Sequence, residues 1–416
     1  MIRFDVFVLF ITCFCGNIEA ISQGSALTVC YFSNWAIFRP GIGRYSLDDI
    51  PGGLCTHVLY AFVGFSEKSP LKITEMKPAD DVNPNGLRKF SELRNRFPST
   101  KLLVSVGGWG QDSSVFSTMV SSAENRRQFC NSVVSLLNAF ELDGFNFQWL
   151  WPGHASRGGT TNDKANFALL LKELSDAFEL DGHDRELTVT APIEEFRLNE
   201  GYAVTDVCRY VDYIYLTAYE LRGPWNNFTD VHTPMQGRSF ESEAFKHFNV
   251  MDGVSLWTQR GCPVGKLVLG VTTQGITYTL KAYNENGLGA PINGPGEMGE
   301  FTKSAGYMSY YEICKRIQDG WKVRRDGTGK VPFITKNDQW IGYDDIESLK
   351  LKVNLVRQRG LAGAMIYALD MDDYRGLCGQ RYPITEFISA EMKKIPAASN
   401  YDITFGIDRE SYDDEK

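Results

Sequence analysis

The hydrophobic residues of this chain fall into two alternating patterns. Short runs rich in β-branched, leucine and aromatic residues predict buried strands, whereas several segments between them repeat their apolar residues every three to four positions, as helices do. The strand pattern occurs eight times, at residues 27–32, 57–63, 101–106, 143–151, 187–192, 211–216, 267–271 and 363–368. Eight strands with helices between them predict an α/β fold of the (β/α)8 TIM-barrel type, and a doubly wound parallel sheet is the alternative.

Helix boundaries are clearest in three of the intervening segments. Residues 123–140 and 163–180 each carry an apolar stripe with the period of a helix. Asp344 and Asp345 are candidate N-caps for a later helix, and Gly360 suits its C-terminal end. These segments are expected to cover the outside of the barrel.

The gap between the seventh and eighth strands is too long for a single crossover. Residues 276–342 hold their own strand and helix patterns, separated by turns rich in glycine and proline. We therefore expect a small α+β domain inserted into the barrel, which itself comprises residues 21–275 and 343–395. Residues 396–416 form an acidic tail that is expected to be disordered.

The N-terminal residues predict export from the cell. Residues 1–20 combine a basic start at Arg3, an apolar core and a small residue at Ala20, which is the pattern of a cleaved secretory signal. That apolar run is too short to span a bilayer and no later run is long enough, so a secreted, extracellular protein without a membrane span is expected. The net charge of −8 argues against a nucleic-acid partner and suits a neutral sugar or a protein partner equally well.

Cysteine usage fits an extracellular protein but does not fix the pairing. The mature chain would keep an odd number of cysteines, namely Cys30, Cys55, Cys130, Cys208, Cys262, Cys314 and Cys378. Secretion favours disulfides, and at least one sulfur must then stay unpaired within the chain. The mature chain lacks the spacing of metal-binding cysteines, so no metal is expected at them. No other cofactor is expected. Asn227 begins an Asn-Phe-Thr sequon and is a candidate glycosylation site.

The most informative stretch is residues 143–153, with the sequence DGFNFQWLWPG. Side chains of a strand alternate between two faces, which separates an aromatic face from a second face made of Gly144, Asn146, Gln148 and Leu150. The aromatic face, which includes Trp151, suits packing against helices. Asn146 and Gln148 are then expected inside the barrel, with Leu150 at its mouth.

This stretch resembles the signature of glycoside hydrolase family 18, the chitinases, which reads D-G-x-D-x-D-W-E-Y-P-G. Further similarities follow in order along nearly the whole mature chain, among them Cys30 to Trp35, Ser105 to Trp109, Gln339 to Asp345 and Gly363 to Asp370. Animal chitinases and chitinase-like proteins are the most similar group. The resemblance implies the disulfides Cys30–Cys55 and Cys314–Cys378, and it leaves the pairing of Cys130, Cys208 and Cys262 open.

The three acids of that signature are missing, because their positions hold Asn146, Gln148 and Leu150. In the family one glutamate protonates the glycosidic oxygen while the acetamide of the substrate acts as nucleophile, and leucine at position 150 has no proton to give. The resemblance therefore implies a degenerate chitinase fold without catalytic activity. Hydrolysis would require a relocated acid, for which the candidates are Glu194, Glu195 and Glu220.

The family binds chains of N-acetylglucosamine by stacking sugar rings on aromatic side chains, with a few polar anchors. The resemblance places in that groove Tyr31, Trp35, Phe62, Gly108, Trp109, Tyr219, Glu220 and Tyr367. Three substitutions alter it, since Gln274 and Ile276 stand where the family has a tyrosine and an arginine, and Tyr367 stands where it has a tryptophan.

Two functions are therefore expected, with residual hydrolysis as a third. The first is a secreted chitinase-like lectin that binds chitin or N-acetylglucosamine oligosaccharides without cleaving them, which the retained Trp35, Trp109 and Tyr219 favour. The second is a secreted signalling or effector protein that binds a protein partner or receptor and keeps the groove as a relic, which Gln274, Ile276 and Tyr367 favour.

Overall fold

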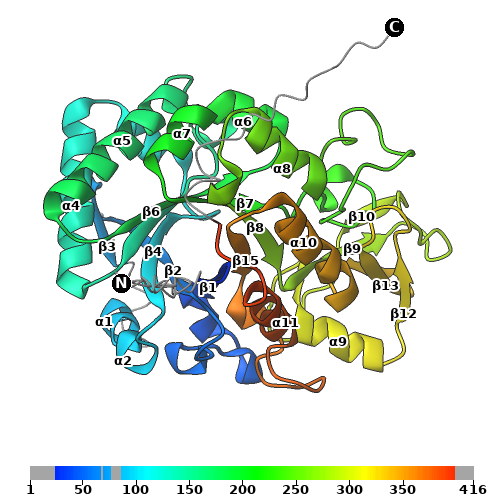
Figure 1. Ribbon diagram of the computed structural model, residues 1–416. Helices are drawn as coiled ribbons and strands as arrows, with labels where there is room; N and C mark the ends of the chain where they lie inside the picture. Colours follow the sequence, from blue (N-terminus) through cyan, green and yellow to red (C-terminus); the bar gives the residue numbers. More distant parts are fainter. Residues whose placement is uncertain (1–23, 67–68, 76–85, 399–416) are drawn as a thin grey trace, which may run out of the picture.

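The computed structural model describes residues 24–66, 69–75 and 86–398 of the 416 (Figure 1). The predicted signal peptide at 1–20 and nearly all of the predicted tail lie outside the described residues. Within the described part, no helix combines the length and the apolar character needed to cross a bilayer.

Eight parallel strands form the centre of the molecule, and the closed sheet confirms the barrel over a doubly wound sheet. In chain order they are β1 (Leu27–Ser33), β2 (His57–Ser66), β4 (Lys101–Gly107), β5 (Gly144–Gln148), β6 (Glu186–Pro192), β7 (Tyr213–Thr217), β8 (Leu267–Thr272) and β15 (Gly363–Tyr367). Each strand pairs in parallel with the next, and the sheet closes because β1 pairs with both β2 and β15. An additional strand, β3 (Ser69–Glu75), pairs antiparallel with β2.

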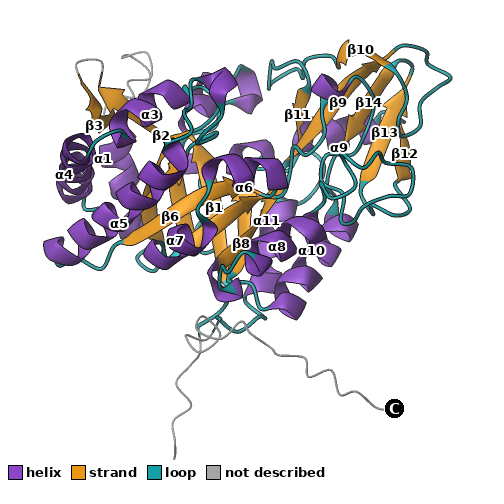
Figure 2. Ribbon diagram, turned by 90° about the horizontal axis from the view of Figure 1, so that it is seen from above, coloured by secondary structure: helices purple, strands orange, loops and turns teal. Residues whose placement is uncertain are grey.

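Helices surround the barrel, as Figures 1 and 2 show. They are α1 (Gly86–Ser91), α2 (Leu93–Arg96), α3 (Ser113–Val120), α4 (Ala123–Phe140), α5 (Asp163–Asp181), α6 (Glu195–Gly201), α7 (Val204–Tyr210), α8 (Val250–Gln259), α10 (Ile346–Arg359) and α11 (Pro383–Met392). The predicted helices over 123–140 and 163–180 are confirmed as α4 and α5, the second one residue longer than predicted.

The two aspartates before α10 have different roles, and only one of them is a cap. Asp345 is the N-cap, because its carboxylate accepts the backbone N–H of Ser348 at 2.9 Å. The prediction that Asp344 caps the helix is wrong, since its buried carboxylate forms an ion pair with Lys352. Gly360 ends the helix with φ 68°, in the left-handed region that a glycine adopts without steric conflict.

A second sheet lies between β8 and β15 in the chain and beside the barrel in Figure 2, which confirms the α+β insertion. Its elements are β9 (Gln274–Leu280), β10 (Ile292–Pro295), β11 (Tyr307–Ser309), α9 (Tyr310–Gln318), β12 (Lys322–Arg325), β13 (Pro332–Lys336) and β14 (Gln339–Gly342). Its hydrophobic core includes Tyr278, Phe333 and Trp340, and the ring of Phe333 stacks on that of Trp340 at 4.8 Å. The sheet begins at Gln274, two residues before the predicted start of the insertion.

Strand alternation places the aromatic residues of β5 as predicted, with one exception. Phe145, Phe147 and Trp149 are buried in the core between the strands and the helices, where Trp149 stacks on Phe116 at 5.0 Å. Trp151 does not continue this face. It lies half-buried beside Trp109, at 6.3 Å between ring centroids, because β5 ends at Gln148 and alternation no longer applies.

Three disulfides connect the described part of the chain. Cys30–Cys55 and Cys314–Cys378 are the pairs that the family resemblance implies, and Cys208–Cys262 is a third pair, which the sequence left open. Cys130 is buried in α4 as a free thiol. Its pKa is raised to about 12 by burial, so the thiol stays protonated and unreactive at neutral pH.

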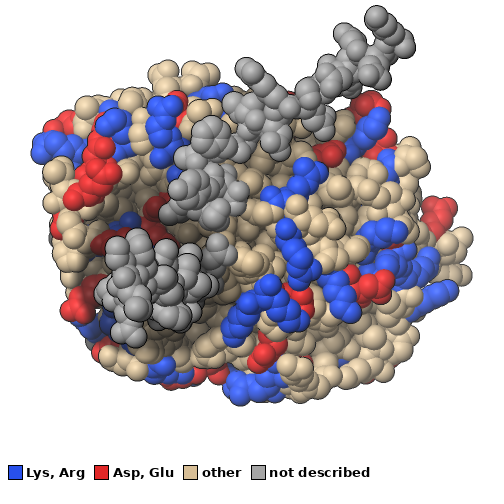
Figure 3. Space-filling view, in the orientation of Figure 1, with Lys and Arg blue, Asp and Glu red and all other residues tan. Residues whose placement is uncertain are grey.

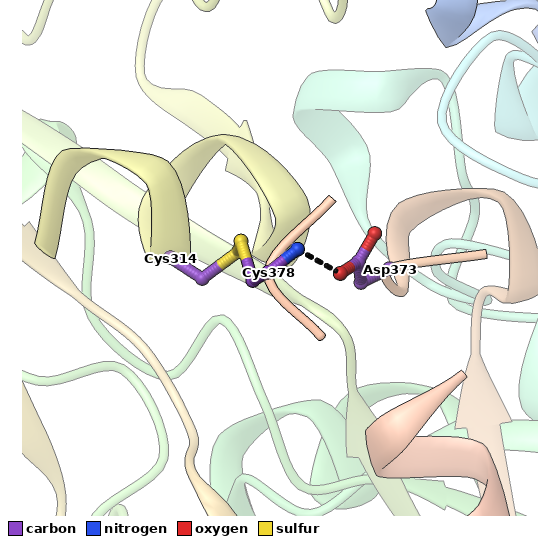
Figure 4. Close-up of side chains that lie close together, drawn as sticks. All are labelled: Cys314, Asp373 and Cys378. Carbon is purple, nitrogen blue, oxygen red and sulfur yellow. Dashed lines mark hydrogen bonds between the residues drawn. A yellow bond between two sulfur atoms is a disulfide. The ribbon is translucent and has the colours of Figure 1, made fainter. Parts of the chain in front are cut away.

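One group of residues near a disulfide has the composition of a metal site. The side chains of Cys314, Asp373 and Cys378 approach within 4.8 Å of one another (Figure 4). The two sulfurs are bonded to each other and offer no thiolate. Asp373 instead accepts the backbone N–H groups of Leu377 and Cys378, both at 2.8 Å, so its role is to fold the loop that carries Cys378.

Candidate functional site

The candidate residues gather at the C-terminal ends of the barrel strands, where parallel barrels carry their sites. Asn146 and Gln148 point inward from β5, and Leu150 follows the strand at the mouth. The lumen is lined by a separate hydrophobic cluster that includes Tyr31, Phe62, Tyr215 and Tyr219. Inward-facing positions were therefore predictable from alternation once the strands had been located.

Asn146 is the centre of a buried, neutral hydrogen-bond network. Its Oδ1 accepts from the Tyr31 hydroxyl at 3.0 Å and from Ser105 Oγ at 2.7 Å, and its Nδ2 donates to Thr188 Oγ1 at 2.9 Å. Burial raises the pKa of Tyr31 far above its ordinary value, so the hydroxyl remains a donor. The network satisfies the Asn146 side chain without any charge.

Above this network lie two buried polar atoms without a partner. Gln148 is 5% exposed and its Oε1 accepts no hydrogen bond, and the buried hydroxyl of Tyr219 has no partner among the described residues. The Tyr219 ring stacks on Tyr367 at 5.6 Å, and Tyr367 in turn meets the edge of Tyr31 at 5.3 Å. A buried polar atom left without a partner costs about 1–3 kcal/mol, so a polar group from outside the chain that bonded to these two atoms would offset that cost.

Glu220 and Gln274 contact each other at the side of the site. Gln274 Nε2 donates to Glu220 Oε1, and this bond links the segment after β7 to the first residue of β9. Burial raises the pKa of Glu220 to about 7, and the hydrogen bond from Gln274 opposes the shift. Ile276 is fully buried in the core of the insertion, so its side chain is not exposed to a ligand.

Exposed aromatic rings form the rim of the site. Trp35 is 40% exposed and stacks on the buried Phe62, with ring centroids 5.7 Å apart and planes 14° apart. Gly108 lies directly against Phe62: a Cβ at this position would come within 2.4 Å of the ring, and its φ of 76° is left-handed. The next residue, Trp109, is 69% exposed. Gly108, Phe62 and Trp35 therefore depend on one another sterically.

Leu150 is half-buried. Glu194 and Glu195, the two candidate acids that follow β6, have partners of their own. The backbone carbonyl of Leu150 accepts from Arg157 Nε at 2.7 Å. Glu194 accepts the backbone N–H of Ile193 at 3.1 Å, and burial raises its pKa. Glu195 is exposed and pairs with Arg260 at 3.1 Å.

Two residues in loops that follow barrel strands were missed by sequence reasoning. Trp225 is 55% exposed in the short turn that follows β7, and a Gly-Pro-Trp turn after a barrel strand is the signal that points to it. Arg157 contacts both Trp109 and the segment after β5, and nothing in its local sequence indicates this.

On the face shown in Figure 3, basic and acidic side chains are interspersed among uncharged ones.

The chain is similar in sequence and in structure to chitinases and to a pseudo-chitinase. The chain is 43% identical over 378 residues to an endochitinase of Manduca sexta, covering 89% of this chain and 68% of that protein. A solved structure of Ostrinia furnacalis Group II chitinase catalytic domain 2 has a TM-score of 0.84 at 32% identity and covers 90% of this chain and 98% of that one. That protein is a variant with leucine in place of one glutamate, in complex with a chitooligosaccharide.

A third relative is human YKL-39, with a TM-score of 0.82 and 30% identity over 88% of this chain and all of that one. It is described as a pseudo-chitinase with retained chitooligosaccharide binding properties. The family model of glycosyl hydrolases family 18 matches residues 27–372, which include all eight barrel strands and the insertion. This chain belongs to glycosyl hydrolase family 18.

Proposed function

We propose that this protein is a secreted chitinase-like lectin that binds chitin or N-acetylglucosamine oligosaccharides without hydrolysing them. The observation that carries the proposal is the pair of unpartnered buried atoms, Gln148 Oε1 and the Tyr219 hydroxyl. An acetamide group complements them, because its N–H donates to an amide oxygen and its carbonyl accepts from a hydroxyl. The exposed rings of Trp35 and Trp109 supply the apolar surfaces on which sugar rings stack.

The absence of hydrolysis follows from the chemistry of position 150. Proton transfer to the leaving oxygen contributes about 10²–10⁴ in rate, and leucine cannot supply it. Asn146 and Gln148 keep hydrogen-bonding groups in the column below but carry no charge to stabilise a positive charge on a reacting acetamide. The Ostrinia variant complex supports the separation of binding from cleavage, since a glutamate-to-leucine protein was crystallised with its oligosaccharide.

A relocated acid is the alternative that would keep the protein an enzyme. Among the three candidates, Glu195 is exposed and ion-paired, and Glu194 is held by the backbone of its own strand end. Glu220 has a raised pKa suited to a proton donor, but its Oε1 is occupied by Gln274. The lectin function therefore requires fewer changes to the observed site than hydrolysis does.

A protein-binding scaffold is the second candidate, and one observation favours it. Gln274 is engaged with Glu220 and Ile276 is buried, so neither contributes a free anchor to the groove. A groove with fewer polar anchors binds sugars more weakly. In this case the barrel surface, outside the groove, would contact a protein receptor.

Calorimetric titration with the N-acetylglucosamine hexamer, with product analysis in parallel, decides among these functions. The lectin proposal expects heat of binding, retention on chitin beads and intact hexamer after prolonged incubation. Tyr219→Phe should weaken binding because it removes the unpartnered hydroxyl and leaves the ring in place. A matched control is Tyr283→Phe, which changes a tyrosine that is 72% exposed in the insertion.

Each contrary outcome has a distinct meaning. Release of shorter oligomers would show an enzyme with a relocated acid. If the titration shows no heat and the protein is not retained on chitin, the scaffold is the remaining function. Equal affinities of wild type and Tyr219→Phe would show that sugar binds without using the buried hydroxyl.

A further inference from the structure

We infer that Arg157 is a positioning residue that fixes Trp109 as a one-sided stacking platform, an inference that rests on the proposed sugar-binding function. Arg157 ends a short 3-10 turn, Ala155–Arg157, in the loop after β5, whereas Trp109 lies in the loop after β4. The contact therefore joins two neighbouring loops at the mouth of the barrel.

The guanidinium group of Arg157 forms hydrogen bonds along its edge, and its face lies against the Trp109 ring. Arg157 Nη2 donates to the backbone carbonyl of Trp109 at 2.7 Å and to that of Gln111 at 3.0 Å. Its Nε donates to the carbonyl of Leu150 at 2.7 Å. The central carbon of the same group lies 4.4 Å from the centroid of the Trp109 ring. One side chain thus fixes the backbone of Trp109 and covers a face of its indole.

The contacts of Arg157 orient Trp109 and do not pair two charges. Arg157 forms no ion pair within the described residues, and its three hydrogen bonds all end on backbone carbonyls. A planar guanidinium is suited to this because it presents several donors in one plane and its face stacks on an aromatic ring. Lysine has the same charge but no planar fork, so it cannot make the same set of contacts.

Trp109 needs such support because little else holds it. The residue is 69% exposed, and its indole nitrogen donates to no described residue. Its aromatic neighbour Trp151 meets it edge to face at 6.3 Å between ring centroids. A mobile exposed ring must be immobilised when a sugar stacks on it, which weakens binding, whereas a ring that is already held avoids this loss. Since Arg157 occupies one face, the sugar is expected on the other.

The test is a double-mutant cycle on hexamer affinity, measured by calorimetry. R157A and R157K are each expected to bind the N-acetylglucosamine hexamer about three- to tenfold more weakly than wild type, the range expected for immobilising one side chain. W109A should also bind more weakly. The double variant R157A/W109A should bind no more weakly than W109A, because Arg157 acts through Trp109. R127A is the matched control, since Arg127 is an exposed arginine on α4, and its affinity should equal that of wild type.

Several results would overturn the inference. Wild-type affinity in R157A would do so, as would a further loss of affinity when R157A is added to W109A, which would indicate a general structural role. If R157A fails to fold, R157K carries the same test. If wild type itself binds no hexamer, the proposed function fails, and Arg157 is tested separately by acrylamide quenching of the Trp109 fluorescence, obtained by subtracting the W109F signal. Stronger quenching in R157A is expected, and unchanged quenching would contradict the role.

Discussion

Glu220 offers a pH-dependent test of how the side of the groove is built. Its carboxyl group is partly buried next to Gln274, and burial raises its pKa from 4.5 to about 7 in the folded protein. The folded state therefore keeps the proton of Glu220 at pH values where the unfolded chain has already lost it. The free energy of unfolding should fall as pH rises from about 4.5 to about 7. In this range Glu220 ionises in the unfolded chain but not in the folded protein, and this ionisation stabilises the unfolded state.

The magnitude follows from the two pKa values. Between pH 5 and pH 8 the contribution of Glu220 to the free energy of unfolding should decrease by about 2.5 kcal/mol, by linkage between a pKa of 4.5 and one of about 7. This is an upper limit, since water screens a carboxylate that is only partly buried. Glu220→Gln removes the titration and leaves an amide oxygen to accept the hydrogen bond from Gln274.

The assay is urea unfolding of wild type and Glu220→Gln at pH 5, 6, 7 and 8. The variant should gain stability over wild type with rising pH, most steeply between pH 5 and pH 7, while other titrating groups cancel in the difference. Glu179→Gln, at an exposed position near the end of α5, is the control and should show no such trend. A difference between Glu220→Gln and wild type that stays constant from pH 5 to pH 8 would refute the buried, protonated carboxyl.

Three further predictions concern the site and its frame. Restoring the acids together as Asn146→Asp, Gln148→Asp and Leu150→Glu should yield little chitinase activity, because Gln274 and Tyr367 remain at the site and the buried Ile276 supplies no anchor to it; robust release of oligomers would show an intact subsite. Replacing Cys208 and Cys262 by serine removes a disulfide that closes a loop of 54 residues and should lower the free energy of unfolding by about 4 kcal/mol. Urea unfolding without a reducing agent measures this loss. Gly108→Ala should weaken hexamer binding and destabilise the fold by about 1–3 kcal/mol, because its Cβ would meet Phe62 and its φ is left-handed; calorimetry and urea unfolding of the same sample check both effects.

The barrel was predictable because its signals are local. Strand runs, helix periodicity and turn residues repeat along the chain, and period-two alternation correctly placed Phe145 and Trp149 against the helices and Asn146 in the lumen. The same rule failed for Trp151, because it applies only while the strand continues. Asp344 shows a similar limit, since a lysine eight residues later gives it a partner that no capping pattern reveals.

The contacts that shape the site were not predictable, because they join segments far apart in sequence. Glu220 and Gln274 are 54 residues apart, and their bond depends on where the insertion sheet begins relative to β7. Arg157 reaches Trp109 across 48 residues by a route that only the packing of two loops determines. Local sequence fixes which face of a strand a residue occupies, whereas loop packing decides which side chains meet across the mouth.

The distribution of charge argues that binding and cleavage place different demands on this groove. Sugar binding draws on hydrogen-bonding groups and ring faces, which the neutral network around Asn146, the free hydroxyl of Tyr219 and the exposed rings provide. Cleavage would need carboxylates in the same buried column, and a buried charge must be paired or strongly solvated to be stable. Once position 150 holds leucine, an aspartate at 146 or 148 would keep that electrostatic penalty without serving proton transfer. A column of amides that keeps hydrogen-bonding groups and omits the charge therefore supports the proposed binding function over the alternative of hydrolysis.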